Sequence, residues 1–395
     1  MQSEWIDSSA AADRLGVKPA TLYAYVSRGI LRRRYDPQRR RSLFDPEEVE
    51  RLARRGRPRR KPAPTEVVVE SRVTTLGSDR PFYRGRDALT LAETHSFEAV
   101  AEWLWSGELC DAGPWRSRPE AVAAARAAQR RLPADLLSLD RLQIVVTAMA
   151  VTDPLRFHRE PEAVVVTSRA LIAGMIEALP ARSKPLDRTS AAVLWSRLAA
   201  RPPTTAEELK LLETAMVLLA DHELAASTFA ARVAASVRAD PYAVVSTGLG
   251  VVGGPMHGGA SLAVERMLAE ISDPADVPRV IGERLRRGEH IPGAGHAVYR
   301  SGDARGTRLL DLLRRLSPGH PKVIVAERIL VELQMRRLPA YNIDFPLAVF
   351  TTMFDMPLGS GETVFAVART AGWLAHALEE YRTRTRFRPR AITPR

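Results

Sequence analysis

Apolar residues recur at helical spacing through most of the chain beyond residue 95. Apolar side chains separated by three or four positions predict amphipathic helices, and alanine and leucine are abundant while β-branched runs are few. The predicted helices cover residues 96–105, 119–131, 139–152, 161–179 and 205–219, and residues 66–75 form the one predicted short strand of this region. No block of roughly 20–50 residues repeats, which argues against a solenoid. We therefore predict an all-α body.

Residues 1–56 carry a different pattern. Ser8 and Ser9 can cap a first short helix, because their hydroxyls can accept from exposed backbone N–H groups. Pro19 suits the first turn of a second helix, and Gly29 suits the position just past its end. Two short helices joined across a tight glycine turn predict a helix-turn-helix.

The stretch ILRRRYDPQRRRSLF comes next, with two extended pieces around Asp36-Pro37 that predict a β-hairpin. Asp45 then caps a third helix, and Glu48 can reach back to complete a capping box. Helix, turn, helix and hairpin in this order resemble the winged helix-turn-helix of MerR and excisionase proteins, which implies DNA binding.

Basic and aromatic side chains gather on this module. Arginines would contact phosphates, while the second helix would face the bases. The candidate DNA contacts are Thr21, Tyr23, Arg28, Arg32, Arg33 and Arg34, with Arg39, Arg40 and Arg41 as further phosphate contacts. The alternative is a small docking module whose basic face is simply solvated.

Charge is concentrated at the two ends of the chain. The net charge of +12 comprises +8 from residues 1–64, +6 from residues 381–395 and −2 from the remainder. This asymmetry favours an anionic partner at one end or both. Residues 57–64 combine prolines with basic side chains and predict an extended linker ahead of a body at residues 65–395.

Several classes of protein are disfavoured by composition. The single cysteine, Cys110, excludes an internal disulfide and offers no cysteine cluster for a metal, so we expect no metal site. No apolar run approaches the ~20 residues of a membrane helix, and the N-terminus lacks the pattern of a signal peptide. Mean hydropathy is −0.16. We expect a cytoplasmic protein without membrane contact.

Histidines in glycine-rich loops are the first candidate chemical groups. His257 lies in GGPMHGGASLAVERML, just before a predicted helix. The positive end of that helix disfavours a second ring proton, so a neutral imidazole could donate to a developing oxyanion. Gly258 and Gly259 would let the backbone approach a ligand closely. A surface histidine in a glycine loop is the alternative.

Two further histidines and one aspartate complete the candidate set. His296 lies in IPGAGHAVYRSGDAR, again between glycines, and His222 lies in LLADHELAAST. Asp344 lies in YNIDFPLAVF with apolar neighbours, so burial would raise its pKa and favour it as a general base. The alternatives are histidines satisfied by backbone carbonyls, and an aspartate that caps a helix or forms a salt bridge.

Six short stretches follow one another in an order that resembles the citrate synthase family. They are DHELAAST, GGPMHGGA, GAGHAVYRSGDAR, NIDF, FAVARTAGWLAH and RPRA, and the earlier PFYRGRDALTLAETHSFEAVAEWLWSGEL is also similar. The resemblance covers about residues 66–390. It implies a large helical domain and a smaller one at about residues 259–355, packed as a homodimer whose small domain closes on the substrate.

The resemblance implies condensation of acetyl-CoA with oxaloacetate to citrate and CoA, with no cofactor besides the CoA thioester. Asp344 would remove the α-proton, His257 would donate to the thioester oxygen, and His296 would polarise the ketone. The remaining implied contacts are His222, Arg305 and Arg369 for oxaloacetate, Arg388 supplied to the site by the partner subunit, and Arg300 for CoA phosphates. A solvated C-terminal charge run is the other interpretation of Arg388.

Two stretches depart from the family pattern. Phe345 is followed by Pro346, Leu347 and Ala348, where the family usually has an aromatic residue and then Ser-Gly. The usual His-Pro-Met before the helix at 139–152 is missing. These departures leave open a 2-methylcitrate synthase that uses propionyl-CoA, or a slow enzyme retained as a sensor. The basic N-terminal module leaves open a DNA-binding regulator that senses acyl-CoA or oxaloacetate.

Overall fold

The computed structural model describes residues 5–15, 17, 19–37, 41–54, 68–300, 302–383 and 386–389. It divides into two compact units, Met1–Glu70 and Ser71–Arg395, and each is described by itself. Arg39, Arg40 and the predicted linker at residues 57–64 lie outside the described residues.

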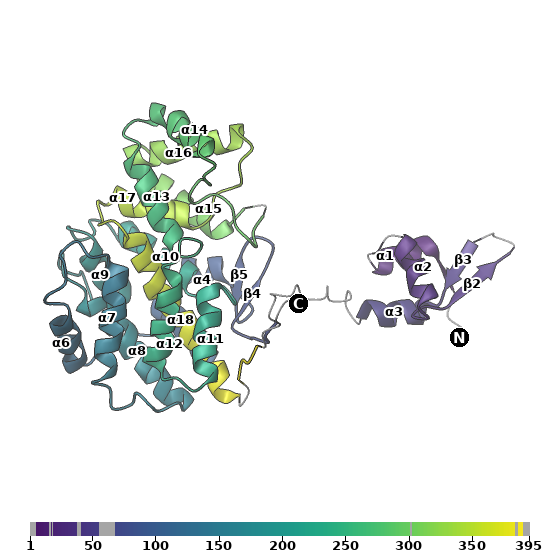
Figure 1. Ribbon diagram of the computed structural model, residues 1–395, viewed down its shortest axis with the longest axis horizontal. Coiled ribbons are helices and arrows are strands. Elements are labelled where there is room, and N and C mark those ends of the chain that lie inside the picture. Colours follow the sequence, from purple (N-terminus) through teal and green to yellow (C-terminus); the bar gives the residue numbers. More distant parts are fainter. Residues whose placement is uncertain are drawn as a thin grey trace, which may run out of the picture. The chain divides into compact units, whose positions relative to one another are not determined.

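The first unit packs three helices against a small antiparallel sheet (Figure 1). Its elements are β1 (Ile6–Asp7), α1 (Ser8–Leu15), α2 (Pro19–Ser27), β2 (Arg33–Asp36), β3 (Arg41–Phe44) and α3 (Pro46–Arg54), with strand order β1-β3-β2. Leu22, Phe44 and Val49 are fully buried in its core. Asp7, and not the predicted serines, caps α1: its Oδ1 accepts the N–H of Ala10 at 2.9 Å. Asp7 is the last residue of β1 and so directly precedes the helix.

The second unit is built almost entirely of helices, which confirms the all-α prediction for the body. Its helices are α4 (Ala88–Thr94), α5 (Phe97–Ser106), α6 (Pro119–Ala128), α7 (Ser138–Ala150), α8 (Pro161–Ala178), α9 (Ser190–Leu198), α10 (Ala206–Leu219), α11 (Ala226–Ser236), α12 (Pro241–Val252), α13 (Gly259–Ala269), α14 (Val277–Arg286), α15 (Ala304–Leu316), α16 (Pro321–Met335), α17 (Asp344–Met353) and α18 (Ser360–Arg382), with the 3-10 turn η1 (Pro274–Asp276). No described helix is long and apolar enough to cross a bilayer.

The small sheet of this unit differs from the predicted strand at residues 66–75. Its strands are β4 (Thr74–Leu76), β5 (Pro81–Tyr83) and β6 (Arg86–Asp87), in that order and antiparallel. Residues 68–73 are described and are not in a strand. The strand is short because pairing with β5 runs only from Thr74, opposite Tyr83, to Leu76, opposite Pro81.

Helix α18 is the centre of the second unit. Nearly all of its 23 residues are buried, and it packs on α5, α8, α10, α11 and α12. A helix that is buried on every side has neighbouring helices packed closely around it. Gly248 of α12 meets it this closely: a Cβ there would lie 2.6 Å from the ring of Trp373.

Helices α13 to α17 group at one end of the second unit, away from α6 and α8 (Figure 1). Helix α13 packs on both α17 and α18, and α15 packs on α17 and α10. The loops at the starts of α13, α15 and α17 therefore come together beside α18, where the candidate site lies.

Candidate functional site

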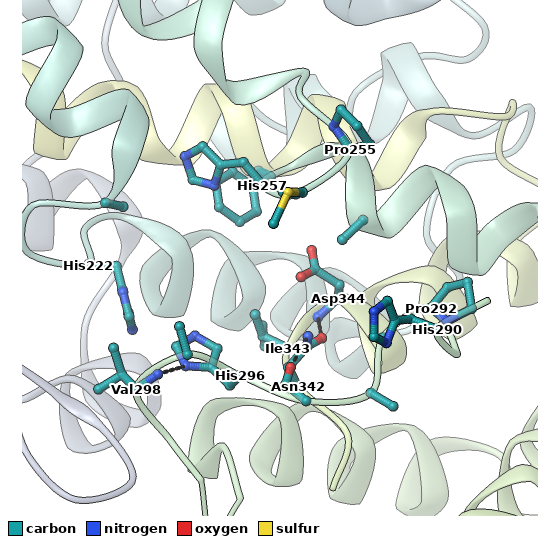
Figure 2. Close-up of a pocket in the computed structure, with 18 of the residues that line it drawn as sticks. His222, Pro255, His257, His290, Pro292, His296, Val298, Asn342, Ile343 and Asp344 are labelled. Carbon is teal, nitrogen blue, oxygen red and sulfur yellow. Dashed lines mark hydrogen bonds between the residues drawn. The ribbon is translucent and has the colours of Figure 1, made fainter. Parts of the chain in front are cut away.

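A cavity of about 720 Å³ opens beside α18 and contains the candidate histidines and aspartate. Figure 2 shows Asp344, His257 and His296 around the same space. Its lining comes from residues 222, 225–226, 255–257, 260, 290–298 and 342–344, together with Arg305, Phe365 and Arg369. Segments far apart in sequence thus meet at one place.

The ring of His257 is held from behind by a serine. Its Nε2 lies 2.6 Å from Oγ of Ser227, and that Oγ also accepts the indole N–H of Trp373 at 3.2 Å. The indole N–H can only donate, so it cannot accept the proton of the buried serine hydroxyl. The hydroxyl therefore donates to Nε2 of His257, which acts as its acceptor. The proton of a neutral His257 is therefore on Nδ1, which has no partner among the described residues.

The two glycines after His257 serve packing. A Cβ on Gly258 would lie 2.7 Å from the carbonyl oxygen of Val252, and one on Gly259 would lie 2.9 Å from those of Gly253 and Gly254. The loop folds tightly on the end of α12, so the predicted need for close ligand approach is not the reason for glycine. Burial, followed by the nearby guanidinium charge of α18, lowers the pKa of the histidine to about 4.

His296 is fixed by its own loop. Its Nδ1 accepts the backbone N–H of Val298 at 3.0 Å (Figure 2). It also accepts the backbone N–H of Tyr299 at 3.1 Å. An acceptor Nδ1 carries no proton, so the neutral ring has its N–H at Nε2. Burial, and to a lesser extent the charge of Arg305, lowers the pKa of His296 to about 4. Both histidines are thus neutral donors at neutral pH.

Asn342 joins the His296 loop to the start of α17, and sequence reasoning missed it. Its Nδ2 donates to the carbonyl of Gly295 at 2.8 Å, and its backbone N–H donates to that of Gly293 at 2.9 Å. Its Oδ1 accepts the N–H of Asp344 at 3.0 Å. One amide side chain therefore sets the spacing between the imidazole and the carboxyl group.

Asp344 is the first residue of α17 and is 8% exposed. Its Oδ1 is buried without a hydrogen-bond partner, and within the described chain it forms no ion pair. Burial raises its pKa to about 7, against the opposing charge of Arg305. The helix N-cap is Ile343, so neither the capping nor the salt-bridge interpretation fits. A carboxyl group poised near neutrality suits a general base.

Two buried arginines supply positive charge. Arg305 forms a two-point ion pair with Asp303, at 2.9 and 2.8 Å, and Asp303 also accepts the N–H of Ile343. Arg369 donates through Nε to the carbonyl of Leu219 at 2.8 Å, while its buried Nη1 has no partner in the part of the chain that the structure describes. A buried guanidinium nitrogen that lacks an acceptor is costly, so Arg369 is suited to an anionic ligand.

His222 borders the cavity on the side of His296. Its Nε2 lies 3.0 Å from the hydroxyl of Tyr299, and its ring centroid is 5.2 Å from that of His296. Burial is the main cause that holds the pKa of His222 well below its ordinary value. A third neutral imidazole therefore adds hydrogen-bonding capacity without adding charge.

Comparison with known proteins gives this cavity a context. The sequence profile described as "Citrate synthase, C-terminal domain" matches residues 65–390. Citrate synthase 2 of Bacillus subtilis is 30% identical over 82% of this chain and 93% of its own length. The chain belongs to the citrate synthase family. Members of this family are acyltransferases and need no cofactor beyond the CoA substrate.

Other members of the citrate synthase family are similarly close. 2-Methylcitrate synthase 1 of Corynebacterium glutamicum is 29% identical over 78% of this chain and 87% of its own length. The crystal structure of citrate synthase from Thermotoga maritima has a TM-score of 0.65 at 26% identity, over 84% of this chain and 94% of that one. Citrate synthase from Thermoplasma acidophilum, in a ternary complex with carboxymethyl coenzyme A and oxaloacetate, shares the fold at a TM-score of 0.70 and 23% identity, over 84% and 95%.

Not every predicted contact lies at this citrate synthase cavity. Arg300 and Arg388 are both exposed, and neither lines it. Sequence reasoning also missed Ser227, Trp373 and Tyr299. DHELAAST contains Ser227, yet nothing local in that stretch indicates that its hydroxyl faces a histidine 30 residues away.

The candidate DNA contacts lie on the first unit. Arg28, Arg33 and Arg34 are exposed, Tyr23 is 42% exposed, and Thr21 is half-buried on α2. Arg32 differs, because Glu48 holds its guanidinium at 2.6 Å and Asp45 holds it at 3.2 Å. The guanidinium of Arg32, predicted to contact phosphate, is thus occupied by an intramolecular ion pair.

Proposed function

We propose that this chain condenses acetyl-CoA with oxaloacetate and releases citrate and CoA. The observation that carries the proposal is the cavity in which Asp344, with a pKa of about 7, lies with two neutral imidazoles. Enolisation of a thioester needs a base and an oxyanion donor together, and this arrangement offers both.

Condensation would begin at the acyl α-carbon. Asp344 takes a proton from that carbon while Nδ1–H of His257 donates to the thioester oxygen, which gains negative charge. The enolate carbon then attacks the ketone carbon of oxaloacetate, and Nε2–H of His296 stabilises the alkoxide that forms. Water finally hydrolyses the thioester, which yields a carboxylate and the CoA thiol.

Oxaloacetate would be held by its two carboxylates. Arg369 has a buried nitrogen that needs an acceptor, and Arg305 is held rigidly by Asp303. Planar guanidinium groups match carboxylates in two-point geometry. His222 would add a neutral hydrogen bond at the same end of the cavity.

Thiol release from acetyl-CoA in the presence of oxaloacetate tests the proposal. Asp344→Asn keeps the shape and removes the base, so the rate should fall by roughly 10²–10⁴-fold. Propionyl-CoA in a parallel assay tests 2-methylcitrate synthesis, which the similarity to the Corynebacterium glutamicum enzyme favours. Equal rates for wild type and variant with both thioesters would refute the enzyme proposal.

We further propose a homodimer in which Arg388 reaches the partner's cavity and residues 259–355 form a closing lobe. Large apolar side chains are exposed on neighbouring helices around α12: Val151 after α7, Val166 on α8 and Val233 on α11. Exposed apolar side chains on helices that pack on a common neighbour are consistent with an interface on this side of the second unit. A monomeric mass in solution, or unchanged turnover in Arg388→Ala, would contradict this arrangement.

A second function, DNA binding by the first unit, is supported by its exposed cations. Arg33 lies 5.9 Å from the ring of Tyr23, and Arg34 lies beside it on β2. Binding should weaken steeply with salt, because phosphate contacts release counterions. Arg33→Ala with Arg34→Ala should abolish a DNA mobility shift that Arg32→Ala, the ion-paired control, leaves nearly intact. A shift unaffected by deletion of residues 1–70 would rule out this module.

A further inference from the structure

A buried carboxylate behind the cavity takes no part in the proposed chemistry. Glu265 lies on α13 and is 2% exposed. Charged side chains are rarely enclosed to this degree unless their hydrogen bonds are satisfied, because burial without partners costs several kcal/mol. The hydrogen-bond partners of Glu265 therefore indicate its role.

Three donors from two other helices converge on Glu265. Oε2 accepts the backbone N–H of Gly359 at 2.6 Å, and Oε1 accepts that of Gly361 at 2.9 Å. Oε1 also accepts the hydroxyl of Thr351 at 2.7 Å. The glycines lie at the start of α18, where unpaired N–H groups and the helix dipole favour an anion. Thr351 lies on α17.

These three helices are the ones that hold the reacting groups. Helix α13 begins two residues after His257, α17 begins at Asp344, and α18 carries Arg369. We propose that Glu265 is a positioning residue: by bonding α17 and the start of α18 to α13, it fixes the distance between the base Asp344 and the donor His257. This role rests on the proposed condensation.

The packing around Glu265 supports the role. A Cβ on Gly361 would lie 2.0 Å from Oγ of Ser261 and 3.1 Å from Oε1 of Glu265. Only glycine lets α13 approach α18 this closely, and only this approach brings the carboxylate within reach of the backbone. Gly359 has φ of +85°, a conformation that glycine adopts without strain.

A second acid lies next to this cluster and has a different character. Glu362, on α18, is also buried, and burial followed by the charge of Glu265 raises its pKa to about 7. Asp140 and Asp344 act in the same direction, and Arg266 opposes them. Burial also raises the pKa of Glu265, but the hydrogen bonds from Gly359, Gly361 and Thr351 oppose that rise. At Glu362 the influence that opposes burial is the charge of Arg266, so of the two acids Glu265 has the stronger support for a negative charge.

Neighbouring threonines of α17 provide a matched test. Thr351→Val removes the hydroxyl that reaches Glu265. Thr352→Val removes a hydroxyl whose bonds to described residues stay within its own helix, to Ala348 and Val349. Glu265→Gln replaces one carboxylate oxygen with an amide N–H₂ group, which faces at least one of the three donors and cannot accept its hydrogen bond. We expect kcat to fall about tenfold in Glu265→Gln and about threefold in Thr351→Val, with KM for oxaloacetate within about twofold and Thr352→Val unchanged.

The isotope effect separates positioning from a general loss of structure. With methyl-deuterated acetyl-CoA, the primary isotope effect on kcat should rise in Thr351→Val and Glu265→Gln, because misplaced base and donor slow proton abstraction. Should Glu265→Gln fail to fold, Thr351→Val alone decides. Wild-type isotope effects in Thr351→Val, or equal losses in both threonine variants, overturn the role. Absence of thiol release by the wild type refutes the proposed function and the role together.

Discussion

The pKa of Asp344 leads to a prediction about the acid side of the pH profile. A base must be ionised to accept a proton, and a group with a pKa of about 7 is roughly one tenth ionised at pH 6 and nine tenths ionised at pH 8. The histidines at 257 and 296, with pKa values of about 4, stay neutral across this range. We therefore expect kcat/KM for acetyl-CoA, measured at subsaturating oxaloacetate, to rise about tenfold from pH 6 to pH 8.

The same pKa has a consequence for stability. Raising a carboxyl pKa from 3.8 to about 7 corresponds to on the order of 4 kcal/mol. The folded state holds the proton more tightly than the unfolded state, so stability falls as pH rises through this interval. Asp344→Asn removes the ionisation and should be more stable than the wild type at pH 8 by a few kcal/mol, with little difference near pH 4.

Two measurements check this reasoning: thiol release between pH 5.5 and 8.5, and urea unfolding of wild type and Asp344→Asn at pH 4.5 and 8. The reasoning is refuted by an acid limb near pH 4, or by the same limb in the residual activity of Asp344→Asn. It is also refuted if Asp344→Asn is less stable than the wild type at pH 8, because burial would then not be the dominant influence on this carboxyl group.

Three further outcomes are expected. Ser227→Ala should lower kcat about 10- to 100-fold, because it leaves Nε2 of His257 and the indole N–H of Trp373 without their partner. The proton of His257 could then occupy either ring nitrogen. Trp373→Phe leaves the serine–histidine bond in place and should have a smaller effect in the same steady-state assay. Asn342→Ala should lower kcat at least tenfold with little change in melting temperature. Deletion of residues 1–70 should leave thiol release within about twofold of the full chain, because the second unit has its own core.

Local sequence is sufficient to nominate the candidate site residues. Glycines around His257 and His296, and apolar neighbours around Asp344, indicate unusual settings for polar side chains. The structure places all three at one cavity, yet their convergence depends on how α13, α15 and α17 pack beside α18. From the sequence, this packing could be expected only through the resemblance to the citrate synthase family.

The groups that hold the candidate site residues in place were missed for a physical reason. Ser227 meets His257 across 30 positions and Trp373 across 146, so no periodic pattern connects them. Asn342 is ambiguous by itself, because an asparagine beside a helix start usually suggests a turn. Capping was also misassigned: Asp7 competes with two serines for the start of α1, and strand pairing decides which residue precedes the helix.

Substrate binding should shift the titration of Asp344 in a defined direction. Arg305 and Arg369 both lower its pKa in the free protein. The carboxylates of oxaloacetate would neutralise these charges, and closure over the substrate would exclude further water, so both effects raise the pKa of the base. Since kcat reports the ternary complex, and kcat/KM for acetyl-CoA at subsaturating oxaloacetate reports the free enzyme, the acid limb of kcat should lie at higher pH than that of this kcat/KM. A kcat limb at lower pH would mean that oxaloacetate does not pair with these arginines.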